Sequence, residues 1–216
     1  MTITEQLDKL FDIWVRRFPK YKDTFVADGI IDEEVFIRQN LKVLFIAKEP
    51  NDPKQESGDF RTWWREEVKY SFSHRICEWA YGLLNHFPPI EKLPYENNQR
   101  IRIMRSIAFM NLKKNGGGAN ADHDTIQSVV ETEREFILEE ISIIKPNLII
   151  GCVGHTRIWD ILFPGIKFLK SGFDIKVARF SSYKFIDFYH PSYRVPRAMS
   201  YCLLGRVFDS IVFKKL

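Results

Sequence analysis

The sequence predicts an α/β fold in three layers, with helices on both faces of a central sheet of four parallel strands. Two observations predict it. Short apolar runs alternate along the 216 residues with longer segments of helical periodicity, as in parallel sheets with crossover helices. Each run also ends abruptly in polar residues, and ligands bind at the carboxyl ends of the strands in an open parallel sheet. The predicted strands cover residues 41–47, 107–110, 147–153 and 185–189.

The helices between these strands follow from apolar spacing and from local start and stop signals. Thr4 can cap a first amphipathic helix, which Pro19 ends. Consecutive glycines at 116–118 require a loop, because glycine is entropically costly in regular structure. Asp122 or Asp124 can then cap a long helix. The predicted helices cover residues 4–18, 32–39, 57–67, 73–86, 98–105, 122–144, 156–163 and 195–213, and a short additional strand lies near 175–179.

The composition excludes a disordered chain and a membrane-spanning one. Hydrophobic residues make up 45% of the chain and charged residues 28%. No apolar run approaches the roughly 20 residues that cross a bilayer, and the N-terminus lacks the pattern of a signal peptide. We therefore expect a cytoplasmic protein. We also expect a monomer with one domain, residues 1–216, in which helices within 1–40 pack on a core of 41–213.

The charge and the cysteines restrict partners and cofactors. A net charge of +4 permits a polyanionic partner such as nucleic acid, although a modest excess of cations is also common on solvated surfaces. The cysteines at 77, 152 and 202 lack the spacing of metal ligands, and so do His74, His123 and His155. We therefore expect no metal and no cofactor.

Three polar groups at the predicted strand ends carry a resemblance to a known family. Ala47-Lys48-Glu49-Pro50 follows the first strand, Asn111 ends the second, and His190-Pro191-Ser192 follows the fourth. Over residues 41 to about 213 this order resembles the uracil-DNA glycosylase superfamily, whose members carry a GQDP- or GEAP-type motif, a strand-end Asn and an HPS-type motif. The resemblance implies the spatial order 2-1-3-4 for the strands. Lys48 and Asn51 depart from the first motif, and the cysteines that bind an iron–sulfur cluster in some branches are absent.

The resemblance implies a DNA glycosylase of base-excision repair, which hydrolyses the N-glycosidic bond of uracil or another deaminated base in damaged DNA. We expect a monofunctional glycosylase, because no lysine is evidently placed as the attacking amine. His190 would donate a hydrogen bond to the departing base, where negative charge develops. Glu49 would orient water or stabilise the cationic sugar. Asn111 would bind the base edge through its amide. The other expected base contacts are Pro50, Asn51, Tyr70 and Phe72, and the expected DNA contacts are Lys48, Lys113, Lys114, Ser192, Tyr193, Arg194 and Arg197.

Each of these residues also has a structural explanation. Glu49 can form a salt bridge with Lys48 or another cation, and Asp52 is an alternative acid in the same loop. His190 can cap a buried strand, and Asn111 can satisfy backbone groups at a strand end. The sequence places no lysine clearly as an attacking amine, although Lys48 keeps a lyase activity open. The alternative function is a catalytically inactive nucleic-acid- or nucleotide-binding relative with the same fold, and a third is an unrelated α/β enzyme acting on a small nucleotide.

Overall fold

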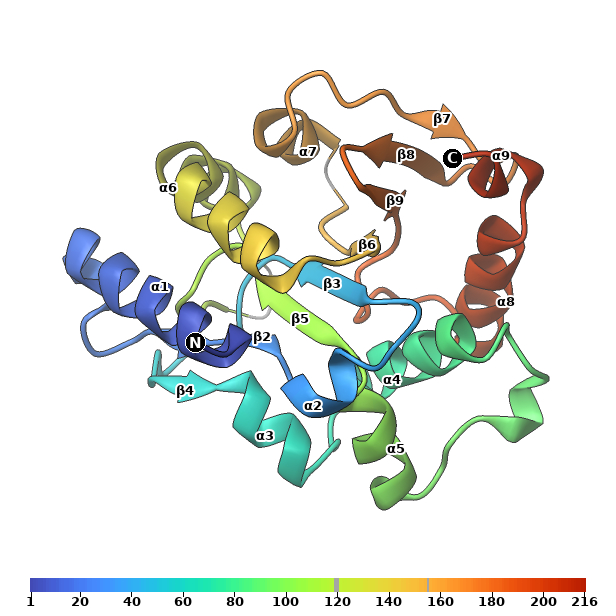
Figure 1. Ribbon diagram of the computed structural model, residues 1–216, viewed down its shortest axis with the longest axis horizontal. Coiled ribbons are helices and arrows are strands. Elements are labelled where there is room, and N and C mark those ends of the chain that lie inside the picture. Colours follow the sequence, from blue (N-terminus) through green and yellow to red (C-terminus); the bar gives the residue numbers. More distant parts are fainter. Residues whose placement is uncertain (119–120, 155) are drawn as a thin grey trace.

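The computed structural model describes residues 1–118, 121–154 and 156–216 (Figure 1). Its centre is a mostly parallel sheet with helices on both faces, so the predicted α/β class is confirmed. Two features of the sequence analysis lie outside the described residues. They are the end of the glycine-rich loop, at Ala119 and Asn120, and His155.

Within the described residues the main sheet has seven strands, where the sequence predicts four. The strands of the protein are β1 (Val26–Ala27), β2 (Gly29–Ile30), β3 (Val43–Ala47), β4 (Gly58–Asp59), β5 (Ala108–Asn111), β6 (Leu148–Gly151), β7 (Leu169–Lys170), β8 (Lys176–Phe180) and β9 (Tyr183–Asp187).

The sheet has the order β2-β5-β3-β6-β9-β8-β7, and β1 pairs separately with β4. The strands anticipated as the central four are β3, β5, β6 and β9, which pair in parallel. The other three, β2, β7 and β8, extend the edges in antiparallel pairing. β8 matches the short additional strand near 175–179, whereas β2 and β7 are only two residues long. Two residues are too few for an alternating apolar pattern to reveal a strand.

The central strands are apolar because both of their faces are buried. All five residues of β3 are buried. Val43, Phe45 and Ala47 belong to one hydrophobic core, and Leu44 and Ile46 belong to the other. Since alternate side chains of a strand point to opposite faces, a strand covered on both sides has a continuous apolar sequence.

Helices supply the outer layers (Figure 1). Those of one core are α3, α4, α5, α8 and α9, and those of the other are α1, α2, α6 and α7. No helix among the described residues is both long and apolar enough to cross a membrane. The helices are α1 (Ile3–Arg17), α2 (Glu33–Phe36), α3 (Phe60–Glu66), α4 (Ser71–Leu84), α5 (Asn97–Met104), α6 (His123–Ile144), α7 (Thr156–Leu162), α8 (Arg197–Phe208) and α9 (Ile211–Lys214), with 3-10 turns η1 (Pro19–Tyr21) and η2 (Ile90–Lys92).

Several helix boundaries differ from the sequence prediction, including that of α3, which begins at Phe60 because Gly58–Asp59 forms β4. Side-chain hydrogen bonds explain two further differences. Thr2, and not Thr4, caps α1, because Thr2 and Glu5 form reciprocal hydrogen bonds in a capping box. The Thr4 hydroxyl instead donates to Glu33 in α2, at 2.7 Å. The last predicted helix is interrupted, since the Ser210 side chain accepts the Phe213 N–H and begins α9 as a separate helix.

The carboxyl ends of β3, β5, β6 and β9 lie at one edge of the sheet. Ala47 at the end of β3 pairs with Asn111 at the end of β5, and Gly151 at the end of β6 pairs with Asp187 at the end of β9. The pairing of β5 with β3 continues beyond the strands, because the Lys113 N–H donates to the Lys48 carbonyl at 2.9 Å. Residues directly after these strands are therefore held near one another.

Candidate functional site

The carboxyl edge of the sheet carries the residues that the sequence singles out for chemistry. Lys48 and Glu49 follow β3, Asn111 ends β5, and His190 lies three residues after β9. Lys48 interacts electrostatically with both Glu49 and His190, so it lies within reach of each of them. Phe72 of α4 approaches His190, with 5.5 Å between the ring centroids.

Glu49 is held in an almost buried ion pair. Its side chain is 7% exposed, and its carboxylate lies 2.5 Å from the Lys113 ammonium. Lys113 also donates to the backbone carbonyls of Asn115 and Gly116, at 3.3 and 3.1 Å. The salt bridge that the sequence left open as an explanation of Glu49 is therefore present, and Lys113 is its partner. Lys113 is consequently not a free cation for a DNA phosphate.

The glycine-rich loop covers the Glu49 carboxylate. The Gly117 N–H donates to the Pro50 carbonyl at 3.0 Å, and Gly117 forms a parallel bridge with Asn51. A Cβ atom at Gly117 would overlap the Glu49 carboxyl group, so only glycine leaves space for the side chain beneath it. The loop thus fixes the position of the acid.

We expect Gly117→Ala to lower the free energy of unfolding by about 1–3 kcal/mol, because the new methyl group displaces either the loop or the Glu49–Lys113 pair. Gly118→Ala is the matched control, since no described atom lies within 4 Å of its Cβ position. Both changes restrict the unfolded chain equally, so their difference isolates the clash. Urea denaturation measures it, and equal stability of the two variants would show that the loop does not press on Glu49.

Asn111 presents a buried amide that the protein leaves partly unpaired. The residue is 1% exposed, and its backbone N–H donates to the Asp28 carboxylate at 2.7 Å. Its side-chain Nδ2 has no hydrogen-bond partner among the residues that the structure describes. A buried donor without a partner costs stability, and at a strand end this donor can bind the acceptor of a ligand.

His190 is positioned as a neutral donor. Its Nδ1 accepts the Ser192 N–H at 3.2 Å, which assigns the ring proton to Nε2. Burial, and to a smaller extent the positive charge of Lys48, lowers the pKa of His190 to about 4. The imidazole is therefore neutral at pH 7 and carries an Nε2–H that can donate to an oxygen where negative charge develops.

The aromatic side chains predicted for the base differ in exposure. Phe72 is half-buried and lies 5.8 Å from Phe109 as well as beside His190. Tyr70 is 72% exposed. Tyr193 is 60% exposed and stacks on Tyr189, with 5.5 Å between the ring centroids. Phe72 therefore lies next to His190, whereas the rings of Tyr70 and Tyr193 are exposed at the surface, where another ring can stack on them.

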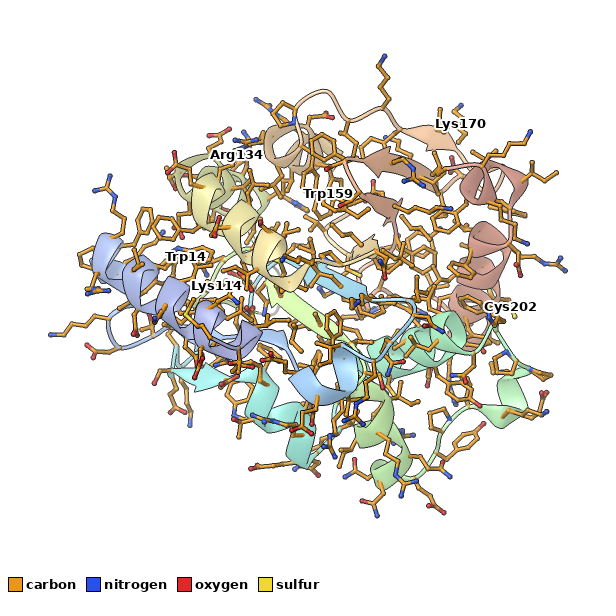
Figure 2. All side chains as sticks on the ribbon, viewed as in Figure 1. Trp14, Lys114, Arg134, Trp159, Lys170 and Cys202 are labelled. Carbon is orange, nitrogen blue, oxygen red and sulfur yellow. The ribbon has the colours of Figure 1, made fainter. Side chains whose placement is uncertain are left out.

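The predicted DNA contact of Lys114 is wrong. Its side chain is fully buried and forms ion pairs with Asp28 at 2.5 Å and with Glu140 at 2.7 Å. Its ammonium also lies 5.3 Å from the Trp14 ring, beneath α1 (Figure 2). Charges buried in this way are satisfied by one another and cannot reach a phosphate.

Arg197 also has a structural role. Its guanidinium pairs with the buried Glu78 carboxylate at 2.6 Å and lies over the Tyr95 ring.

Asp52, the alternative acid, accepts the backbone N–H groups of Lys54 and Glu56 at 3.0 and 2.7 Å. This explains Asp52 as a turn-forming residue. Of the remaining predicted contacts, Pro50 is buried, and Asn51, Ser192 and Arg194 are exposed.

Lys113, Asp28 and Glu140 are the residues near the site whose roles the sequence analysis missed. Lys113 and Glu49 are 64 positions apart, and Lys114 and Asp28 are 86 positions apart. No local pattern pairs side chains at such separations.

In residues 1–118, 121–154 and 156–216, no group of three or more His, Cys, Asp and Glu side chains is placed to hold a metal ion. Comparison of the chain with protein-family models and with curated proteins gives no match.

Proposed function

We propose that the protein is a DNA glycosylase of the uracil-DNA glycosylase type, which hydrolyses the N-glycosidic bond of uracil or another deaminated base in DNA. The observation that carries this proposal is the buried Asn111 amide, whose Nδ2 has no partner among the described residues. It lies at the same carboxyl edge of the sheet as the neutral His190. The order β5-β3-β6-β9 supports it, because it corresponds to the order 2-1-3-4 that the resemblance implies.

Each side chain has a role in such a reaction. The base must leave the stack before its bond can be reached. The Asn111 amide can then donate through Nδ2 and accept through Oδ1, which matches the alternating edge of uracil. The Nε2–H of His190 can donate to the base oxygen that becomes negative as the bond breaks. The Glu49 carboxylate, held by Lys113 at 2.5 Å, can stabilise the positive charge that develops on the sugar.

One observation favours the alternative, a binding relative without turnover. The Lys113 ammonium neutralises the Glu49 carboxylate, so the acid acts on the sugar less strongly than a free carboxylate would. Oligonucleotides with a single uracil, hypoxanthine or xanthine separate the two functions. Base release, detected by cleavage at the abasic site in alkali, supports the glycosylase. Tight DNA binding without release from any of these bases would replace it by the binding relative.

We expect Asn111→Asp to lower uracil release by about 10- to 100-fold, because the substitution removes the donors that face the base edge. Single-turnover release from a uracil oligonucleotide is the measurement, and thermal unfolding shows whether the variant folds. Asn115→Asp is the control for the added negative charge, since Asn115 lies in the adjoining loop and its amide contacts Gln55. Equal rates in the two variants would mean that Asn111 does not bind the base.

A further inference from the structure

Lys48 differs from the two lysines near it because its ammonium forms no ion pair within the part of the chain that the structure describes. Lys113 pairs with Glu49, and Lys114 pairs with Asp28 and Glu140. The Lys48 ammonium has no ion pair or hydrogen bond with any residue in the described ranges, although the side chain is half-buried. Its position, directly after β3, is fixed by the backbone, since the Lys48 carbonyl accepts the Lys113 N–H.

The surroundings of Lys48 favour its neutral amine. Burial lowers the pKa of Lys48, and the nearby Glu49 carboxylate opposes this only in part, because its own charge is shared with Lys113. His190, the other titratable group that interacts with Lys48, is neutral and supplies no compensating negative charge. A lysine amine that is partly desolvated and unpaired is the kind of group that attacks carbonyl carbons in proteins.

We propose that Lys48 forms an imine with the aldehyde of an abasic deoxyribose and cleaves the DNA strand by β-elimination. The inference rests on the proposed function in one respect, namely that release of the base at this edge of the sheet leaves such a sugar beside Lys48. The protein would then act on its own product.

The chemistry requires no oxidant or metal. The Lys48 Nζ bonds to C1′ of the ring-opened sugar, and the aldehyde oxygen leaves as water, which gives a protonated imine. Removal of a proton from C2′ sends that electron pair into a C2′–C3′ double bond, and the 3′ phosphate leaves with the electrons of the C3′–O bond. The adjoining Glu49 carboxylate can accept the proton. Water then hydrolyses the imine and regenerates the Lys48 amine.

Trapping with borohydride tests the proposal directly. The full chain is incubated with an oligonucleotide that contains a preformed abasic site, and borohydride reduces any imine to a stable amine link. We expect one covalent adduct per protein chain, cleavage of untreated DNA without alkali, and attachment of the sugar to Lys48 when the adduct is mapped by mass spectrometry. Mapping on the unmodified chain needs no variant to fold.

Lys48→Arg keeps the positive charge but cannot form an imine, so we expect it to lower adduct formation by at least about tenfold. Lys54→Arg is the matched control, because Lys54 is exposed in the same loop and should react as the unmodified chain does. An absent adduct, attachment to another amine, or equal trapping by Lys48→Arg and the unmodified chain would each overturn the proposal.

The preformed abasic site makes this outcome independent of base release. If uracil is released normally but no imine is trapped, the lyase fails and the glycosylase stands. If the imine forms but no base is released, the glycosylase fails and Lys48 remains a nucleophile towards abasic DNA.

Discussion

Lys114→Met is expected to lower the free energy of unfolding by about 3–5 kcal/mol at neutral pH, because it leaves two buried carboxylates without a cation. The side chains of Lys114, Asp28 and Glu140 are all fully buried. Asp28 also accepts the backbone N–H of Asn111 at 2.7 Å, so the ion-pair cluster supports the strand end that carries the candidate base contact.

The loss of stability in the Lys114→Met variant should depend on pH. Burial raises the pKa of Glu140, the Lys114 charge opposes this, and the charge of Asp28 adds to it. A folded-state pKa above the unfolded value means that Glu140 stabilises the fold at low pH, and that this contribution is lost as pH rises through the folded-state pKa. Removing Lys114 takes away the opposing charge, so Lys114→Met should be destabilised more at pH 8 than at pH 5.

Urea denaturation at the two pH values measures this effect. Lys54→Met is the control, because Lys54 is exposed and its substitution should change stability by no more than about 0.5 kcal/mol. A Lys114→Met variant as stable as Lys54→Met, with no dependence on pH, would mean that the buried carboxylates find compensation without the lysine.

The parts of the fold that sequence reasoning could predict are those set by local patterns. The central strands are predictable because burial on both faces makes β3 and β6 continuous apolar runs. The cap of α1 was misplaced because Thr2 and Thr4 are both good capping residues. The choice between them depends on which partner each finds, Glu5 for Thr2 and the distant Glu33 for Thr4.

The candidate site divides in the same way. Residues that directly follow a strand, such as Glu49 and His190, could be placed from the sequence because the parallel arrangement places strand ends together. The residues that pair with their charges could not be identified from the sequence. One signal was available for Lys114, however. Met110 and Leu112 belong to the core that contains Trp14, and Lys114 is the next residue in the same every-second-residue pattern. Because alternate side chains of an extended chain lie on the same face, this pattern predicts that the Lys114 side chain points into that core.

His190→Ala is expected to lower base release by about 100- to 1,000-fold, the loss typical of removing one donor to a developing negative charge. Ser192→Ala is the matched control. It removes the Ser192 hydroxyl but keeps the backbone N–H that donates to His190 Nδ1 at 3.2 Å. We expect that variant to lose less than about tenfold, since the tautomer is unchanged. Equal losses in the two variants would show that the loop, and not the imidazole, determines the rate.

The pH dependence gives a second test of the same residue. Because burial and the Lys48 charge lower the pKa of His190 to about 4, the rate should show no step near pH 6.5 that belongs to this group. The unfolded chain binds the proton more tightly than the folded chain, so stability is greatest above pH 6.5 and is lost as pH falls towards 4, by no more than about 3 kcal/mol. His190→Gln, whose amide does not titrate, should lack this loss. If NMR or the rate shows that His190 titrates near pH 6.5, its imidazole is exposed to water and cannot act as a fixed neutral donor.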